Sequence, residues 1–202
     1  YSSLLPDILC ALEQGRLLVV DTTLMSELEQ FLLNTIIARS LFDLRRALRT
    51  AATVDDLEQA VRQAFGHDEE NGQRGLRTLA DALVERIEEG TLPYKIEGRL
   101  QPLDSLPRVN IVIEEAPSIL NSERMRHGSV FRDISRQGRK FGMGLTVVSQ
   151  QVSEIDSGVL TQLNTELFLN LGNDAERRAA VRNASSDLAG FENELRIMSR
   201  GQ

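Results

Sequence analysis

Two acidic residues stand directly after a run of apolar, mostly β-branched residues near the middle of the chain. The run is VNIVI, residues 109–113, and Glu114 and Glu115 follow it. Carboxylates suit Mg²⁺, which binds hard oxygen ligands through one or two carboxylates together with substrate phosphates. A second carboxylate beside the metal ligand can orient or deprotonate a water molecule. The pair could therefore divide its work between a Mg²⁺ ion and a nucleophile.

The same two acids also have a purely structural interpretation. They precede the helix-starting residues 116–118, Ala-Pro-Ser, and negative charge near a helix N-terminus is favoured by the helix dipole. A second polar strand end favours chemistry instead, because the stretch GLTVVSQ ends in Ser149 and Gln150. Ligands of open parallel sheets bind outside the carboxyl ends of the strands. We expect Asp21, which follows the apolar run GRLLVV, at the same edge.

Strands and helices alternate in the second half of the chain. A strand, a helix and a second strand separated by a crossover of this length form a βαβ unit with parallel strands. The fold class predicted is therefore α/β, with an open and mostly parallel sheet. Strands are predicted at 15–21, 109–115, 144–150 and 166–172, with a short one near 94–96, and helices at 28–48, 54–65, 75–89, 121–138 and 157–163.

The chain length and the distribution of elements predict one main domain with an insertion. A chain of 202 residues can bury a core without disulfides or metals. Residues 1–50 supply a strand and a long helix of the core, and residues 109–202 supply the remaining strands. Residues 51–108 are predicted to be a helical insertion with an irregular connection, including an exposed loop at 66–75.

The charge of the chain is uneven. Its net charge is −7, which argues against a uniformly basic nucleic-acid binder. One window nevertheless reverses the sign, with six cations and one acid: Arg124, Arg126, Arg132, Arg136, Arg139 and Lys140 against Asp133. Such a window predicts either a partner that carries negative charge or a solvated helix face.

Neither the apolar runs nor the cysteine content suggests a membrane or an oxidising compartment. The longest apolar runs, such as residues 17–20, are far shorter than a bilayer span. The single Cys10 cannot form an intramolecular disulfide, which fits a reducing cytoplasm. We therefore predict a cytoplasmic protein without a membrane segment, in which Cys10 is a small core residue.

Three stretches of the chain resemble HerA-type DNA translocases, which are relatives of FtsK and of conjugative VirB4-like ATPases. The stretches are IVIEEAPSIL, SRQGRKFGMGLTVVSQQVSEI and VLTQLNTELFLNLGNDAE. The resemblance covers residues 105–202 well and residues 4–49 loosely. It implies a RecA-like P-loop NTPase fold, of which this chain is the C-terminal half of the ATPase domain.

The resemblance also implies a role for each matching residue. Glu114 stands where the Walker B acid binds Mg²⁺, and Glu115 stands where the adjacent glutamate activates the attacking water. Gln150 occupies the sensor position that contacts the γ-phosphate of ATP. Arg139, or else Arg136, would be the arginine finger offered to the nucleotide of a neighbouring subunit.

The chain departs from the family pattern in three places. Pro117 stands where the family usually has His, and Gln151 and Val152 stand where it commonly has Arg and Pro. The phosphate-binding loop G-x-x-x-x-G-K-[ST] is missing, because the only lysines, Lys95 and Lys140, lie in other contexts. We expect this loop upstream in a longer protein, and we expect this chain alone to be inactive.

The function implied is that of an ATP-driven motor subunit. Such subunits form hexameric rings that move along double-stranded DNA, beside a nuclease or an antiviral defence effector. One alternative is a catalytically inactive scaffold or interaction module with the same fold, and another is a conjugative VirB4-like ATPase. A metal-dependent hydrolase that uses His67 or His127 is less well supported, since neither histidine has metal-ligand spacing.

Overall fold

The computed structural model describes residues 4–66, 78–126, 129–169, 171, 173–183 and 196–197. The chain divides into two compact units that are each described by themselves. Unit 1 consists of Tyr1–Thr23, Ile36–Asn110 and Gly138–Gly144, and unit 2 consists of Leu24–Thr35, Ile111–Gln137 and Leu145–Gln202. These units follow spatial contacts, whereas the three-part division at residues 50 and 108 stays a prediction.

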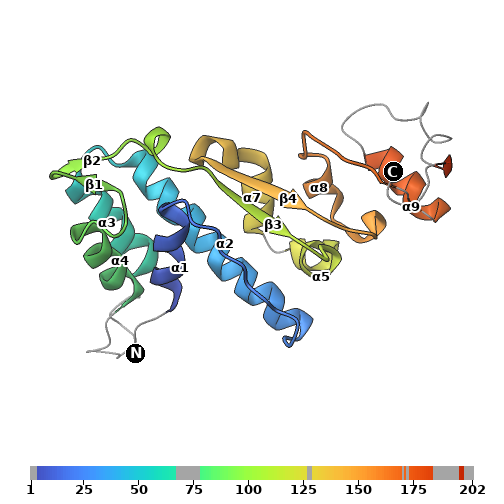
Figure 1. Ribbon diagram of the computed structural model, residues 1–202, viewed down its shortest axis with the longest axis horizontal. Helices are drawn as coiled ribbons and strands as arrows, with labels where there is room; N and C mark the ends of the chain where they lie inside the picture. Colours follow the sequence, from blue (N-terminus) through green and yellow to red (C-terminus); the bar gives the residue numbers. More distant parts are fainter. Residues whose placement is uncertain are drawn as a thin grey trace. The chain divides into compact units, whose positions relative to one another are not determined.

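Unit 1 is built mainly from helices. It contains α1 (Leu4–Glu13), α3 (Val54–Phe65), α4 (Leu79–Glu88) and the C-terminal part of α2 (Glu27–Thr50) (Figure 1). Capping boxes at Thr53 and Thr78 fix the first turns of α3 and α4. The apolar faces of these helices bury a common core that includes Leu9, Leu41, Leu44, Leu57, Leu83 and Ile87. The helices predicted at 28–48 and 54–65 are thereby confirmed.

A small hairpin and a 3₁₀ turn complete this unit. Strands β1 (Lys95–Ile96) and β2 (Arg99–Leu100) pair in antiparallel orientation, and η2 (Leu103–Ser105) follows them. Tyr94 and Leu103 on either side of the hairpin are buried. The short strand predicted near residues 94–96 is therefore confirmed.

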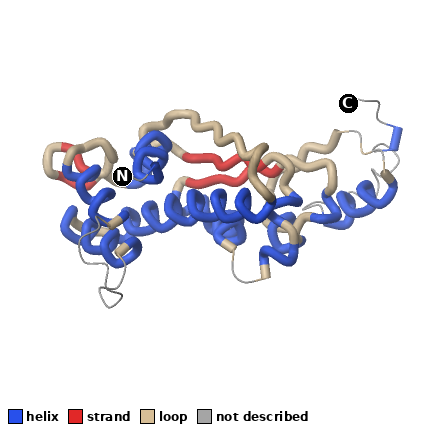
Figure 2. Tube along the Cα trace, turned by 90° about the horizontal axis from the view of Figure 1, so that it is seen from below, coloured by secondary structure: helices blue, strands red, loops and turns tan. Residues whose placement is uncertain are grey.

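The parallel sheet consists of β3 (Val109–Ile113) and β4 (Met143–Val147), which run side by side (Figure 2). The Val109 N–H donates to the Gly142 carbonyl, and the Val148 N–H donates to the Ile113 carbonyl. The described residues thus form a mixed α/β fold with a small parallel sheet, as predicted. Both strands begin in unit 1 and end in unit 2.

Unit 2 holds short helices around the ends of these strands. They are α5 (Pro117–Leu120), α6 (Ser122–Met125), α7 (Val130–Gln137), η4 (Val152–Glu154), α8 (Ser157–Leu160) and α9 (Asp174–Asn183). Their buried side chains include Leu120, Met125, Phe131, Ile134 and Val159. The ion pair between Arg132 and Asp156 joins α7 to the residue that precedes α8.

Two predictions of secondary structure need correction, and a third lies almost entirely outside the described residues. The single helix expected at 121–138 is divided between α6 and α7, and Asn121 caps α6 by accepting from the Arg124 N–H. The exposed loop predicted at 66–75 lies, apart from Gly66, outside the described residues. The helix predicted at 75–89 corresponds to α4, which begins at Leu79 within the described part of the chain.

Two predicted strands are absent from the described residues. Residues 16–22 form no strand, and Leu17 and Val19 are 91% and 81% exposed. Residues 166–169 and 171 form no strand either, and Leu167 is 90% exposed. An apolar run becomes a buried strand only where a neighbouring strand and a covering layer take up its hydrogen bonds and side chains.

No helix in the described ranges combines the length and the apolar character that a membrane span requires.

Candidate functional site

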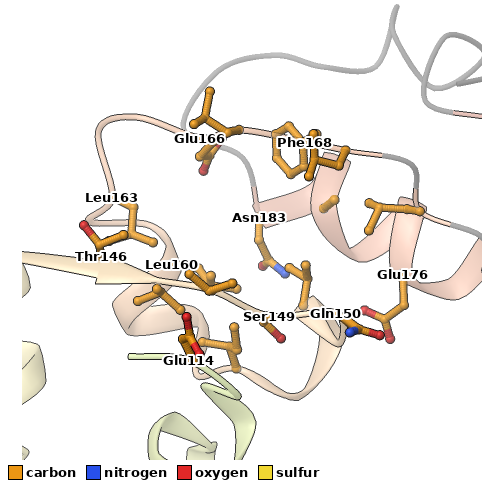
Figure 3. A pocket seen from close by; sticks show the side chains of 18 of the residues that line it. Glu114, Thr146, Ser149, Gln150, Leu160, Leu163, Glu166, Phe168, Glu176 and Asn183 are labelled. Carbon is orange, nitrogen blue, oxygen red and sulfur yellow. The ribbon is translucent and has the colours of Figure 1, made fainter. Parts of the chain in front are cut away.

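A cavity of about 1070 Å³ lies in unit 2, at the carboxyl ends of β3 and β4. A volume of this size is in the range of small-molecule and cofactor sites. Figure 3 shows Glu114, Ser149 and Gln150 along one side of the cavity and Glu166 and Phe168 along the other. The structure thus brings together three of the site residues predicted from the sequence, which are Glu114, Glu115 and Gln150.

The two acids after β3 present exposed carboxylates to this cavity. Glu115 has a φ of 49°, in the left-handed region that non-glycine residues rarely adopt. The Ser118 N–H and hydroxyl both donate to the Glu115 carbonyl, at 3.1 and 2.8 Å. The next N–H, of Ala116, donates to the Val148 carbonyl at 3.3 Å. Hydrogen bonds at Glu115 and at the next residue therefore stabilise a strained backbone conformation. Strained conformations of this kind cluster at functional sites.

Gln150 lies in the loop after β4. The Gln151 N–H donates to the Ser149 hydroxyl at 2.9 Å, which closes a tight turn around Gln150. A smaller hollow of about 210 Å³ is lined by Glu115, Pro117, Ser149, Gln150 and Gln151. Pro117 and Gln151, where the chain departs from the family pattern, therefore lie beside the predicted catalytic residues.

The opposite wall of the cavity comes from α8, from α9 and from the segment between them. Glu176 on α9 accepts hydrogen bonds from the Ser153 N–H and hydroxyl, at 3.0 and 2.5 Å, which links α9 to η4. Reasoning from the sequence did not identify Glu176 or Asn183 as lining residues. The sequence did contain a signal for the start of α9, the helix that carries both residues, because Asn173 caps it by accepting from the Ala175 N–H.

The predicted arginine fingers are not lining residues of the cavity. Among the described residues that line the cavity, neither Arg136 nor Arg139 is present. Both side chains are exposed, Arg136 on α7 and Arg139 on η3 (Gly138–Phe141), and η3 belongs to unit 1. Two other cations of the basic window are used within unit 2, where Arg124 pairs with Glu27 and Arg132 pairs with Asp156.

Asp21 lies in a local turn with Thr23. It belongs to unit 1, whereas the described residues that line the cavity all belong to unit 2. The Thr23 hydroxyl and N–H donate to its carboxylate, and these bonds lower the pKa of Asp21 below its usual value. The expectation that Asp21 gathers with Glu114 at one sheet edge stays a prediction.

The donor set of the cavity fits Mg²⁺ better than a closed protein-bound metal. The described residues contain no group of three or more His, Cys, Asp and Glu side chains that could hold a metal ion. Exposed carboxylates beside an open cavity match an ion that takes its other ligands from water and phosphate. His67 and His127, on which the hydrolase alternative depends, lie outside the described residues.

Comparison with known proteins identifies relatives that cover part of the chain. It is 37% identical over 71 residues to the DNA double-strand break repair helicase HerA of Pyrococcus furiosus, a match over 33% of this chain and 12% of that protein. HerA of Sulfurisphaera tokodaii is 30% identical over 115 residues, which are 54% of this chain and 23% of that protein. A probable helicase of Methanocaldococcus jannaschii is 25% identical over 126 residues, covering 61% and 23%.

No protein-family model matches the chain. The chain spans less than a quarter of the length of the curated relatives described above. The matches confirm the predicted resemblance to HerA-type proteins, at low identity and partial coverage. The matched relatives are proteins named as helicases, and several are named for DNA double-strand break repair.

Proposed function

We propose that this chain supplies the hydrolytic half of an ATPase site in a HerA-type DNA translocase. The motor would be a hexameric ring that moves along double-stranded DNA in the cytoplasm, working with a nuclease or a defence effector. The phosphate-binding loop would come from another part of a longer protein. Support comes from the likeness to archaeal HerA helicases and from the chemistry of one cavity.

One observation carries the proposal. Two acids that follow one parallel strand and an amide that follows the next line the same cavity. This combination suits phosphoryl transfer, because an acid can bind the metal, a second acid can orient the attacking water, and an uncharged donor can contact the transferred phosphate. The strained backbone of Glu115, held by Ser118, fits a residue whose carboxylate must be placed accurately.

Each side chain then has a defined task. Glu114 would hold Mg²⁺, which neutralises the charge that develops on the phosphate oxygens. The Glu115 carboxylate accepts a hydrogen bond from the attacking water and takes its proton. The Gln150 amide donates to a γ-phosphate oxygen of ATP.

The arginine finger is assigned to a neighbouring subunit. Arg139 or Arg136 would reach the nucleotide of the next copy, which agrees with their exposure and with their place outside the cavity lining. A planar guanidinium can meet two phosphate oxygens at once. Placing it on the neighbour would make hydrolysis depend on assembly.

The proposal is tested by ATP hydrolysis in a full-length protein that contains this chain. Wild type and a Gln150→Ala variant are assayed with Mg²⁺, with and without duplex DNA. We expect activity that duplex DNA stimulates and that Gln150→Ala lowers by about 10²-fold, as for the removal of one donor to a transition state. Thr161→Ala, which removes a hydroxyl bond to the Ser157 carbonyl outside the cavity lining, is the matched control and should hydrolyse ATP near the parental rate.

Other results would favour the alternatives. An assembled protein that binds DNA but never hydrolyses ATP would point to the scaffold or interaction module. Activity that does not respond to duplex DNA would favour a transport ATPase of the conjugative, VirB4-like kind.

A further inference from the structure

The turn that carries Arg139 and Lys140 lies immediately before β4 in unit 1. Both side chains are exposed, whereas Gly138 in the same turn is buried. The turn closes when the Gly142 N–H donates to the Arg139 carbonyl at 3.3 Å. Its backbone therefore sets the positions from which the two cationic side chains extend.

A buried arginine of α2 donates hydrogen bonds to the backbone at this turn. The Arg45 side chain is 1% exposed, and its Nη1 donates to the Phe141 carbonyl at 3.2 Å and to the Gly142 carbonyl at 3.0 Å. Its Nη2 also donates to the Pro107 carbonyl, two residues before β3, at 2.6 Å. One guanidinium thus donates to backbone carbonyls just before the first residue of each parallel strand.

A buried carboxylate fixes that guanidinium in turn. Glu13 on α1 is 0% exposed, and its two oxygens accept from the Arg45 Nε and Nη2 at 2.7 and 2.9 Å. A bidentate pair of this kind restricts both the position and the plane of the guanidinium. Arg45 is therefore an oriented donor, with its charge balanced by Glu13.

The turn is shaped to accept this donor. Gly142 has a φ of 63°, and a Cβ placed on it would lie 2.9 Å from the Arg45 Nη1. Phe42, three residues before Arg45 on α2, packs edge to face on Phe141, with ring centroids 5.0 Å apart. Two side chains of one helix therefore clamp the same turn.

We propose that Arg45, oriented by Glu13, is the positioning residue for Arg139 as the in-trans arginine finger. This inference rests on the proposed function. A finger has to meet phosphate oxygens of the neighbouring subunit, and displacement of a catalytic group by about 1 Å can cost about 10²-fold in rate. Arg45 is buried with its donors engaged, so it acts through the turn and does not reach the nucleotide itself.

The first test measures the turn in the chain itself. Arg45→Lys keeps the charge beside Glu13 but replaces the planar fork with a single ammonium group, so the turn loses donors. Trypsin cleaves after Arg139 and Lys140, and we expect cleavage there to become several-fold faster, as followed by mass spectrometry. Arg86→Lys, which alters a more exposed ion pair with Asp7 in the same unit, is the matched control and should leave that cleavage unchanged.

The second test assigns Arg45 to a complementation group in the full-length protein. Arg45→Lys should lower ATP hydrolysis by about 10- to 100-fold. Subunit exchange with Glu115→Gln should restore part of the activity, because Glu115→Gln subunits still offer a well-placed Arg139. Exchange with Arg139→Ala should restore none, because neither partner then offers one. Gly142→Ala, which disturbs the same contact from the side of the turn, should behave in the same way if Arg45→Lys does not fold.

The outcomes separate the two proposals. If Arg139→Ala and Glu115→Gln fail to complement each other despite proven subunit exchange, Arg139 is not the in-trans finger. This inference is then wrong, and the proposed function has to place the finger at Arg136 or give up the shared site. Suppose instead that Arg139→Ala and Glu115→Gln do complement each other. The positioning role of Arg45 is then wrong if Arg139→Ala rescues the Arg45→Lys and Gly142→Ala proteins, or if these proteins keep parental activity and parental trypsin cleavage. In either case the proposed function stands.

Discussion

A pair of charged side chains is buried at the amino ends of the parallel strands, whereas two acids are exposed at their carboxyl ends. At the amino ends, in unit 1, Arg45 and Glu13 are fully buried and bind each other and three backbone carbonyls. At the carboxyl ends, in unit 2, Glu114 and Glu115 are exposed to a cavity. Buried charge is tolerated only where partners replace water, whereas a site for a charged ligand has to keep its groups accessible.

The comparison also shows how each end is made rigid. The amino ends are fixed by side chains, through the Arg45 fork and the contact between Phe42 and Phe141. The carboxyl ends are fixed by backbone and hydroxyl bonds, through Ser118 to the Glu115 carbonyl and the Gln151 N–H to Ser149. Fixing the backbone leaves the carboxylate and amide groups available for a ligand.

The largest effect is expected from breaking the buried ion pair. Arg45→Met leaves Glu13 buried without its partner and leaves three carbonyls without a donor, which should lower the free energy of unfolding by about 3–5 kcal/mol. Urea denaturation of this chain measures the change. Arg62→Met, which removes the exposed pair with Asp81 in the same unit, should cost no more than about 1 kcal/mol.

A double variant sharpens this prediction. Glu13→Leu combined with Arg45→Met removes both charges, so it should recover part of the stability that Arg45→Met loses. Recovery should stay incomplete, because the carbonyls of Phe141, Gly142 and Pro107 still lack their donor. Equal losses in the Arg45→Met and Arg62→Met proteins would contradict the contrast between buried and exposed charge.

A smaller effect is expected at the glycine that accepts Arg45. Gly142→Ala combines a left-handed φ with a contact to Arg45, which cannot move away because Glu13 holds it. We expect a loss of about 2–3 kcal/mol in the free energy of unfolding. Gly90→Ala has a φ of 77° with nothing within 4 Å of the new Cβ, so it measures the backbone cost alone, about 1 kcal/mol. A Gly142→Ala loss no larger than that of Gly90→Ala would mean that Arg45 gives way easily.

The smallest effect concerns the strained acid of the cavity. Glu115→Gly relieves a φ of 49°, and it should raise the free energy of unfolding by about 1 kcal/mol while abolishing ATP hydrolysis in the full-length protein. Glu97 in the hairpin has a φ of 50°, so Glu97→Gly is the matched control, with the same gain and no loss of activity. If thermal unfolding shows Glu115→Gly to be less stable than wild type, the left-handed backbone is not a source of strain.

Local patterns predicted much of the fold. The helices predicted at 28–48 and 54–65 correspond to α2 and α3. The strands predicted at 109–115 and 144–150 correspond to β3 and β4, which end earlier, at Ile113 and Val147, and the polar residues that follow them line one side of the cavity. These features depend on neighbours in sequence, which is why they can be inferred without a structure.

Features that depend on distant partners were not predicted. Residues 16–20 and 166–169 have apolar composition typical of strands, yet no strand forms there in the described ranges, because composition does not specify a hydrogen-bonding neighbour. The Arg45 and Glu13 pair joins residues 32 positions apart, and Glu176 reaches Ser153 across 23 positions. Arg45 sits in an otherwise amphipathic helix, where a cation is normally expected at the surface.

The most direct measurement compares ATP turnover and ATP binding in Glu115→Gln and Glu114→Gln variants of the full-length protein. We predict that Glu115→Gln keeps the parental affinity for ATP and Mg²⁺ but loses turnover by at least about 10²-fold, because the amide preserves shape without a base. Glu114→Gln should instead raise the Mg²⁺ concentration needed for half-maximal activity. Parental turnover by the Glu115→Gln protein would contradict the central claim that the acids after β3 form a hydrolytic site.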